Sequence, residues 1–309
     1  MLGKALRFKG VRITRTGVRL FSKAQQHSFQ DLTLSPYSQK AIAEAFQYTH
    51  MTGVQGESIP PILEGKDCLA KAKTGEGKTL AFLIPAAELL TEKKETDLIS
   101  SDTSNSSIPI LIISPNRELA AQIASEAHEL LQFHSSCVKN VVCVYGGRSV
   151  QGDIRALNSS NVSMLVATPG RLLDLLENTP HLRNRLKEIK MIIMDEADQL
   201  MEMGFTKAIN NIISYLPKKE CRQTIFFSAT MPPSVQEIAK KHLRKDYLFI
   251  DTVGGKKDCR DSLVNDIVYI NMVAIHLTSF LSLCVLDRVS QRSANAPACV
   301  TRGGECPYQ

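Results

Sequence analysis

The chain has 309 residues, of which 43% are hydrophobic and 22% are charged, and its formal net charge is +6. These values are typical of a soluble protein with a real core, and the length suits one large domain or two of ordinary size. The positive excess lies before the first acidic residue, Asp31, and the rest is nearly neutral. Bulk charge therefore gives only weak support for a nucleic-acid partner. The eight cysteines form no CxxC pair, which argues against a metal or disulfide framework and favours reduced thiols.

Residues 1–27 are predicted to be a basic segment separate from the globular part. They contain seven Lys and Arg residues, several Ser and Thr residues, scattered apolar residues and no acid. This composition suits a mitochondrial or plastid transit peptide, whereas a disordered basic arm that binds polyanions is the alternative. The absence of a long apolar run argues against a secretory signal. We expect a mitochondrial location, with plastid, nucleus and cytoplasm as alternatives.

Residues 28–252 are predicted to form one α/β domain. Two helices, at 36–47 and from Gln55 onward, come first, and residues 91–107 form a polar loop. Short apolar strands at 68–70, 110–113, 141–144, 164–167, 189–194 and 224–227 alternate with helices at 78–90, 118–132, 150–157, 170–176, 207–216 and 234–242. Buried strands separated by helices indicate a parallel sheet covered on both faces, which is a three-layer fold. In such sheets, ligands bind beyond the C-terminal ends of the strands.

A glycine-rich segment between the first of these strands and the next helix is typical of a phosphate-binding loop. Two glycines allow a tight turn, and the following helix points its positive N-terminal end at the same place. Lys78 is expected to reach the β- and γ-phosphates of ATP, and the Thr79 hydroxyl to ligate Mg²⁺. A simple turn before a helix is the alternative for this segment taken alone. The predicted ATP-binding loop consists of Ala72, in place of the usual glycine, with Lys73, Thr74, Gly75, Glu76, Gly77, Lys78 and Thr79.

An acidic tetrapeptide, residues 195–198, follows the strand at 189–194. Asp195 can hold Mg²⁺, directly or through water, opposite Thr79, and Glu196 can orient and deprotonate the attacking water. The alternative, a surface acidic turn, is disfavoured because the same chain carries the phosphate loop. The sequence thus predicts Lys78, Asp195 and Glu196 as catalytic residues, with ATP and Mg²⁺ as cofactors.

The tetrapeptide Asp-Glu-Ala-Asp and its companion motifs resemble those of the DEAD-box RNA helicases, over about residues 28–252. The resemblance implies a RecA-like P-loop domain that uses ATP for local unwinding of RNA. It places Gln55 on the adenine edge and Phe29 against the face of the base. It assigns RNA contacts to Pro115, Arg117, Gly146, Gly147, Thr168, Gly170 and Arg171, and the coupling of hydrolysis to RNA to Ser228 and Thr230.

RNA binding of this kind is expected to be largely independent of sequence. Backbone N–H groups at helix starts and a few arginines grip phosphates, and contacts to 2′-hydroxyls separate RNA from DNA. Each position also has a plainer interpretation. Arg117 can be a solvated charge, Arg171 can pair a nearby acid, and Ser228 and Thr230 can cap the next helix.

Two departures from the family pattern concern single side chains. Asn116 stands where Thr is usual, and Glu76 replaces a small residue in the phosphate loop. A carboxylate that pointed inward would repel phosphates, so Glu76 is expected to point to solvent. Residues 51–53 also replace the usual Pro-Thr-Pro before the glutamine motif.

Residues 253–309 are predicted to be a linker, the start of a second lobe and a divergent tail, as in a truncated, alternatively spliced or wrongly assembled product. The family's second lobe supplies arginines that stabilise the transferring phosphate, and no such motif occurs here. The apolar stretch 267–286 is long enough to span a membrane, but interspersed polar residues argue against an anchor. Two hypotheses remain, an RNA-dependent ATPase that receives a second lobe or protein partner in trans, and an isolated ATP- and RNA-binding lobe without effective turnover. A DNA translocase of another P-loop class is disfavoured by the glutamine motif.

Overall fold

The computed structural model describes residues 27–91, 107–135, 140–158 and 162–253. The predicted targeting segment before residue 27, most of the polar loop after residue 91, and the predicted linker, second-lobe start and tail after residue 253 lie outside these residues. None of the helices formed by the described residues combines the length and apolarity needed to cross a bilayer.

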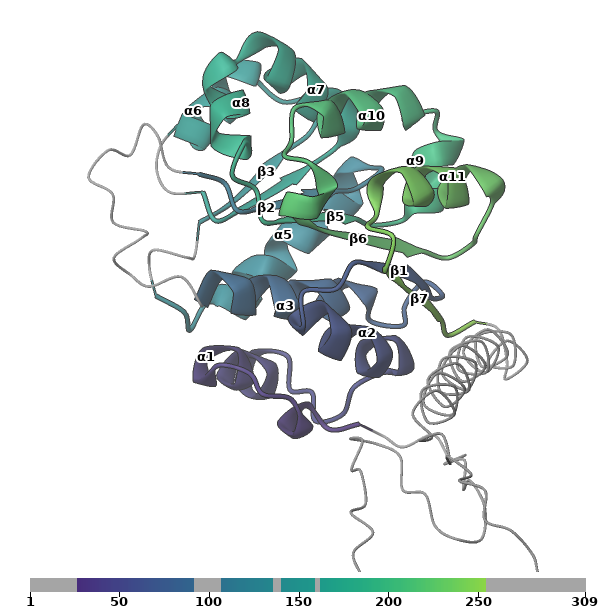
Figure 1. The fold of residues 1–309 in the computed structure, drawn as a ribbon. Helices are drawn as coiled ribbons and strands as arrows, with labels where there is room; N and C mark the ends of the chain where they lie inside the picture. The colour runs from purple at the N-terminus through teal and green to yellow at the C-terminus, as the bar shows by residue number, and fades with distance from the viewer. Residues whose placement is uncertain (1–26, 92–106, 136–139, 159–161, 254–309) are drawn as a thin grey trace, which may run out of the picture. The chain divides into compact units, whose positions relative to one another are not determined.

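A parallel sheet forms the middle layer, with helices above and below it in Figure 1. The sheet has seven strands in the order β3-β4-β2-β5-β6-β1-β7. Every neighbouring pair is parallel, so all the C-terminal ends meet at one edge of the sheet. The strands are β1 (Cys68–Lys71), β2 (Ile110–Ile113), β3 (Val141–Val144), β4 (Met164–Ala167), β5 (Met191–Met194), β6 (Gln223–Ser228) and β7 (Leu248–Asp251).

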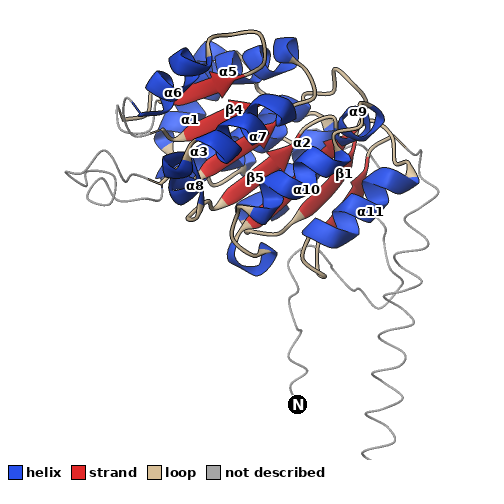
Figure 2. Cartoon of the chain, turned by 90° about the horizontal axis from the view of Figure 1, so that it is seen from above, coloured by secondary structure: helices blue, strands red, loops and turns tan. Residues whose placement is uncertain are grey.

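Helices cover both faces of the sheet, as seen from above in Figure 2. Successive side chains of a strand point to opposite faces, so Ile110 and Ile112 pack into one core and Leu111 and Ile113 into the other. The first core includes residues of η2 (Ala41–Ala45), α2 (Gly53–Leu63), α3 (Lys78–Thr91) and α5 (Arg117–Leu131), and the short helix α1 (Pro36–Lys40) contacts α3 and α5 on the same side. The second includes α6 (Val150–Asn158), α7 (Pro169–Asn178), α8 (Pro180–Leu186), α9 (Ala197–Glu202), α10 (Thr206–Ser214) and α11 (Pro233–His242). The predicted three-layer α/β fold is thereby confirmed.

Several elements differ from the sequence expectations. The helix expected over 36–47 is α1 followed by the π-helical turn η2, and a short 3-10 turn, η1 (Phe29–Asp31), precedes it. The strand expected at 189–194 begins only at Met191. Strand β7 and helices α8 and α9 were not anticipated, because each is short and lies between stronger signals.

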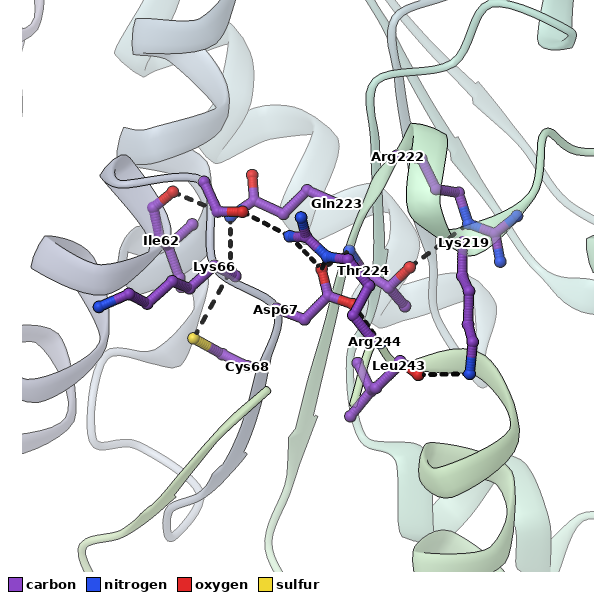
Figure 3. A network of polar contacts seen from close by, with 11 residues as sticks. Ile62, Lys66, Asp67, Cys68, Lys219, Arg222, Gln223, Thr224, Leu243 and Arg244 are labelled. Atoms are coloured by element: carbon purple, nitrogen blue, oxygen red, sulfur yellow. Dashed lines mark hydrogen bonds and ion pairs between the residues drawn. The ribbon is translucent and has the colours of Figure 1, made fainter. Parts of the chain in front are cut away.

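A polar cluster fastens the N-terminal ends of β1, β6 and β7 (Figure 3). The fully buried carboxylate of Asp67 accepts hydrogen bonds from the backbone N–H of Thr224 (2.9 Å) and of Arg244 (2.8 Å). It also forms an ion pair of 2.7 Å with the Arg244 guanidinium. The Gln223 amide donates to the carbonyl of Ile62 at the end of α2, at 2.9 Å. These contacts lie at the edge of the sheet opposite the predicted ligand sites.

Candidate nucleotide-binding and RNA-binding sites

The phosphate loop leaves the C-terminal end of β1 and turns directly into α3. The N–H of Ala72 continues the ladder to the Ser228 carbonyl at 3.0 Å, after which the chain turns through Gly75 (φ 81°) and Gly77 (φ 78°). A Cβ at Gly77 would lie 2.5 Å from the side-chain nitrogen of Gln55, so both the φ angle and the close packing require glycine. The loop adjoins a cavity of about 660 Å³.

Lys78 gives this cavity a positive charge that no hydrogen bond satisfies. Its side chain is buried, and its Nζ has no hydrogen-bond partner among the described residues. A buried ammonium without a partner is costly, whereas a phosphate oxygen would satisfy it. Thr79 follows at the first turn of α3 and lines the same cavity.

Asp195 and Glu196 face the phosphate loop from the end of β5 and complete one wall of the cavity. The Asp195 N–H donates to the Ile113 carbonyl at 3.0 Å, so the hydrogen bonding between β2 and β5 extends to Asp195 and fixes its backbone. Burial raises the pKa of the Asp195 carboxyl to about 6, and the Lys78 ammonium partly offsets that rise. The backbone of Glu196 is left-handed (φ 48°), an uncommon conformation for a non-glycine residue and one that recurs at functional sites.

These residues fit a Mg²⁺-bound nucleotide. No group of three or more His, Cys, Asp or Glu in the described part of the chain is arranged to hold a metal ion unaided. Among the residues that line the cavity, Thr79 can offer a hydroxyl oxygen and Asp195 a carboxylate oxygen to a metal ion beside the buried Lys78. Mg²⁺ ordinarily takes one or two protein ligands and fills the remainder with phosphate oxygens and water, so this donor set suits it.

Gln55 also lines this cavity and lies beside the phosphate loop. It belongs to a capping box at the start of α2: its Oε1 accepts from the Thr52 N–H at 2.9 Å, and its own N–H donates to the Thr52 hydroxyl at 3.4 Å. Its amide nitrogen donates to the Gly77 carbonyl at 3.0 Å. The predicted adenine-reading side chain is thus tied to the phosphate loop itself.

Phe46 and Tyr48 are aromatic residues that line the cavity, and their rings stack at 6.1 Å between centroids. Phe29 does not line it. Its side chain is buried and faces a neighbouring cavity of about 510 Å³, with Tyr48 between the two. The stacking role predicted for Phe29 therefore stays a prediction, and Tyr48 is an exposed aromatic residue that lines both cavities. Sequence reasoning missed Tyr48, although it lies only seven residues before Gln55.

Glu76 differs from the expectation that it points to solvent. Its carboxylate accepts the Lys73 N–H at 3.1 Å, which closes the loop, and the Thr252 hydroxyl at 3.2 Å. It is not among the residues that line the cavity, so the carboxylate does not face the phosphate position. Thr252 follows β7, and its N–H donates to the Lys71 carbonyl at 3.0 Å. Glu76 thus joins the phosphate loop to the end of the edge strand.

The predicted coupling motif follows β6, the strand between β5 and β1, and therefore lies between the acidic tetrapeptide and the phosphate loop. The Asp198 N–H donates to the Ser228 hydroxyl at 3.2 Å. The Asp198 carboxylate accepts from both the N–H (2.8 Å) and the hydroxyl (2.7 Å) of Thr230. Burial opposes ionisation of Asp198, but these hydrogen bonds outweigh it and lower its pKa. The contacts give Ser228 and Thr230 a specific partner in place of the helix cap considered from sequence.

A second hollow, of about 540 Å³, lies beyond the ends of β2 and β4 and gathers most of the predicted RNA-binding residues. The start of α7 opens into it, with Thr168 at the N-cap and Pro169 at the first position. Asn116 caps α5 by accepting the Leu119 N–H at 2.8 Å, which explains how Asn serves in place of Thr. Two helix N-termini therefore point at one groove, which is an arrangement suited to phosphate groups. Its lining consists of Pro115, Asn116, Arg117, Glu118, Gly146, Thr168, Gly170, Arg171, Asp174, Met203 and Phe205.

The Arg117 side chain packs closely against the backbone of Gly147 beside this groove. A Cβ at Gly147 would lie 2.6 Å from a guanidinium nitrogen of Arg117, and Gly147 has a φ of 88°. Gly147 does not line the groove but allows the exposed Arg117 side chain to lie over the loop after β3. In the sequence, this Gly-Gly pair is informative only together with the other motifs of the family.

Arg171 pairs with a nearby acid, which is the plainer of the two roles considered from the sequence. Its guanidinium forms a buried ion pair with Asp153 of α6 and donates to the Arg148 carbonyl at 2.8 Å. The side chain therefore fastens α6 and the glycine loop to α7. A direct phosphate contact from Arg171 stays a prediction, whereas Arg117 is the exposed arginine of this groove.

Two cavity residues on α5 were not singled out from the sequence. Gln122 and Glu126 line the nucleotide cavity together with Leu119, at the i, i+3 and i+7 positions of one helix face. Burial raises the pKa of Glu126, while hydrogen bonds from Gln122 and Thr79 lower it. The helical spacing from the Arg117 motif was visible in the sequence, but nothing there placed this face against the phosphate loop.

The parallel sheet, the phosphate loop and the strand-end acidic pair define a P-loop nucleotide-binding domain of the α/β class. The family model for the DEAD/DEAH box helicase matches residues 52–238, and the chain belongs to this family.

Relatives and a solved structure agree with this membership. A rice protein named DEAD-box ATP-dependent RNA helicase 26 is 42% identical over 277 residues, which cover 89% of this chain and 49% of that protein. Helicase 31 of Arabidopsis thaliana is 47% identical over 225 residues, covering 73% of this chain and 30% of the relative. The crystal structure of a DEAD box protein from Methanococcus jannaschii superposes with a TM-score of 0.60 and 34% identity, over 72% of this chain and 55% of that one. The chain thus spans about half, or less, of the length of these relatives.

Proposed function

We propose that this chain is the ATP-binding lobe of an ATP-dependent RNA helicase, in which ATP binding and hydrolysis are coupled to RNA binding and local unwinding. The observation that carries the proposal is the cavity at the end of β1 and β5, which Lys78 lines together with Asp195 and Glu196 and where the Lys78 ammonium has no hydrogen-bond partner within the described part of the chain. The separate groove at the ends of β2 and β4 provides the RNA site.

Each residue of the nucleotide cavity has a separate role in ATP binding or hydrolysis. Lys78 neutralises phosphate charge, and the Thr79 hydroxyl and Asp195 carboxylate hold Mg²⁺, which when bound supplies further positive charge to the phosphates. Glu196 accepts the proton of the attacking water, which adds to the transferring phosphate as the bond to the ADP oxygen breaks. The Gln55 amide, already fixed to the loop, recognises the adenine edge.

The groove contributes contacts to the RNA backbone. Arg117 supplies charge, and the N-terminus of α7 supplies backbone N–H groups beside the Thr168 hydroxyl. No base-reading arrangement is required for such contacts, so affinity should vary little between RNA sequences and fall steeply with salt. We propose that the coupling runs through Asp198, which is adjacent to the acidic pair and holds Ser228 and Thr230.

Turnover needs a further source of positive charge. No arginine of the described residues lines the nucleotide cavity, and phosphoryl transfer in P-loop enzymes commonly depends on one. We infer that a second lobe or a protein partner, in cis or in trans, supplies it.

The test is ATP turnover by the purified chain, with and without single-stranded RNA. Turnover that rises with RNA and is lost in Glu196→Gln supports the helicase proposal. Nucleotide binding that depends on Lys78 without turnover supports an isolated binding lobe. Failure of the folded protein to bind nucleotide would overturn both.

We also propose that residues 1–27 direct the protein to mitochondria, on the basis of their basic, acid-free composition. A fluorescent protein fused after residue 27 should accumulate in mitochondria, and replacement of the arginines by glutamine should abolish this. A plastid, nuclear or cytoplasmic signal would contradict the proposal.

A further inference from the structure

Helix α5 presents three side chains to the nucleotide cavity, and one of them is a carboxylate. Leu119, Gln122 and Glu126 lie on one face of the helix and line the cavity together with Lys78 and Asp195. The site residues predicted from the sequence do not include Gln122 or Glu126.

The Glu126 side chain is held in a defined position. The Gln122 amide nitrogen donates to its Oε1 at 2.8 Å, one turn earlier on the same helix. The Thr79 hydroxyl lines the same cavity and lies near enough to help lower the pKa of the Glu126 carboxyl, which burial raises. Glu126 is partly buried, whereas its neighbour Glu129, one turn further along α5, is exposed and does not line the cavity.

The orientation of the Thr79 hydroxyl decides whether its oxygen can act as a metal ligand. A hydroxyl that donates its hydrogen to a carboxylate turns its lone pairs away from that carboxylate and becomes a stronger donor to a cation. Outer carboxylates of this kind orient the direct ligands of many metal sites. They also accept hydrogens from metal-bound water, and Mg²⁺ usually keeps several waters.

We propose that Glu126 is a positioning residue for the metal–nucleotide complex, holding the Thr79 hydroxyl and the metal-bound water and making the cavity selective for Mg²⁺-bound over metal-free nucleotide. This inference rests on the proposed nucleotide site. Its electrostatic basis is that three carboxylates, from Glu126, Asp195 and Glu196, share the cavity with one ammonium, from Lys78. A metal-free nucleotide adds negative charge to this set and is repelled, whereas Mg²⁺ offsets that charge.

The experiment measures the affinity of the 309-residue chain for a fluorescent ADP analogue, once with Mg²⁺ and once with EDTA. Glu126→Gln keeps the size of the side chain and removes its charge. We expect it to weaken binding with Mg²⁺ by about tenfold, the lower end of outer-residue effects. Binding with EDTA should be unchanged or tighter, because a repelling charge is gone. Glu129→Gln, the matched control on the same helix, should alter neither affinity.

The pattern of outcomes separates the inference from the function on which it rests. An equal loss with Mg²⁺ and EDTA, or no change in either, overturns the role of Glu126. Retention of nucleotide affinity by Lys78→Ala overturns the proposed site itself. Glu126→Asp, which keeps the charge on a shorter side chain, should retain more of the preference for Mg²⁺ than Glu126→Gln. An equal or greater loss in Glu126→Asp at unchanged melting temperature would contradict the electrostatic argument.

Discussion

Replacement of Asp67 by alanine should destabilise the domain without changing its nucleotide site. Asp67 is fully buried and accepts hydrogen bonds from two backbone N–H groups and from the Arg244 guanidinium. Removing one partner of a buried ion pair costs about 3–5 kcal/mol. The Arg244 side chain is 29% exposed and can regain water, so the lower end of that range applies. The buried Thr224 N–H cannot regain a water molecule as its partner, and leaving it unsatisfied accounts for about 1–3 kcal/mol of the loss.

The expected loss of about 3 kcal/mol in the free energy of unfolding corresponds to a fall in melting temperature of roughly 6–12 °C for a domain of this size. Urea unfolding should give a lower midpoint with an unchanged slope. Arg244→Ala should cost a similar amount, and the double variant should lose less than the sum, because the two residues share one interaction. Asp246→Ala, an exposed change nearby, is the control.

Two results would refute this reasoning. A loss below about 1 kcal/mol would mean that Asp67 does not fasten the strands in the way the hydrogen bonds imply. Loss of nucleotide affinity at a temperature where the variant is folded would mean that the cluster influences the opposite edge of the sheet.

The remaining predictions concern pH, the RNA groove, the adenine end and the coupling motif. Burial and neighbouring cations lower the pKa of His242 to about 4, so the free energy of unfolding should fall as pH drops from about 6.5 towards 4, and His242→Gln should flatten that part of the pH profile in thermal melts. Gly147→Ala should displace the adjacent arginine and weaken RNA binding about tenfold in a polarisation assay, without changing ADP affinity. Tyr48→Ala should reduce adenine nucleotide affinity more than Phe29→Ala does at equal folded fraction, and the reverse order would restore the stacking role of Phe29. Thr230→Ala should reduce the stimulation of ATP turnover by RNA while ADP affinity persists, and equal losses in both would contradict a coupling role.

The sequence was sufficient to predict the sheet and the phosphate loop because their signals are local. The apolar strands bounded by turn residues appear within two residues of the predicted bounds, and Gly77 is constrained by its own backbone angle. The same locality explains why the capping role of Asn116 could have been foreseen: its partner, Leu119, is only three residues away.

Features that depend on distant pairing were beyond sequence reasoning. The partner of Asp67 lies 177 residues further along the chain, and the register of β7 against β1 brings the two together. Arg171 was expected to contact RNA, and its acid Asp153 comes from another helix, so no spacing rule joins them. Glu126 belongs to an ordinary amphipathic helix. Its carboxylate lines the nucleotide cavity only because α5 lies beside the phosphate loop in the folded domain.

Helix α5 begins at the groove proposed to bind RNA and continues along the nucleotide cavity. Arg117 and Glu126 are nine residues apart, which corresponds to about 13 Å along a helix axis. A single inserted residue between them would turn the far end of the helix by about 100° and carry Glu126 out of the cavity while Arg117 stayed in place. The length of α5 therefore fixes the position of one site relative to the other. Side chains in this segment can be replaced, but an insertion or deletion would separate the two sites from their residues.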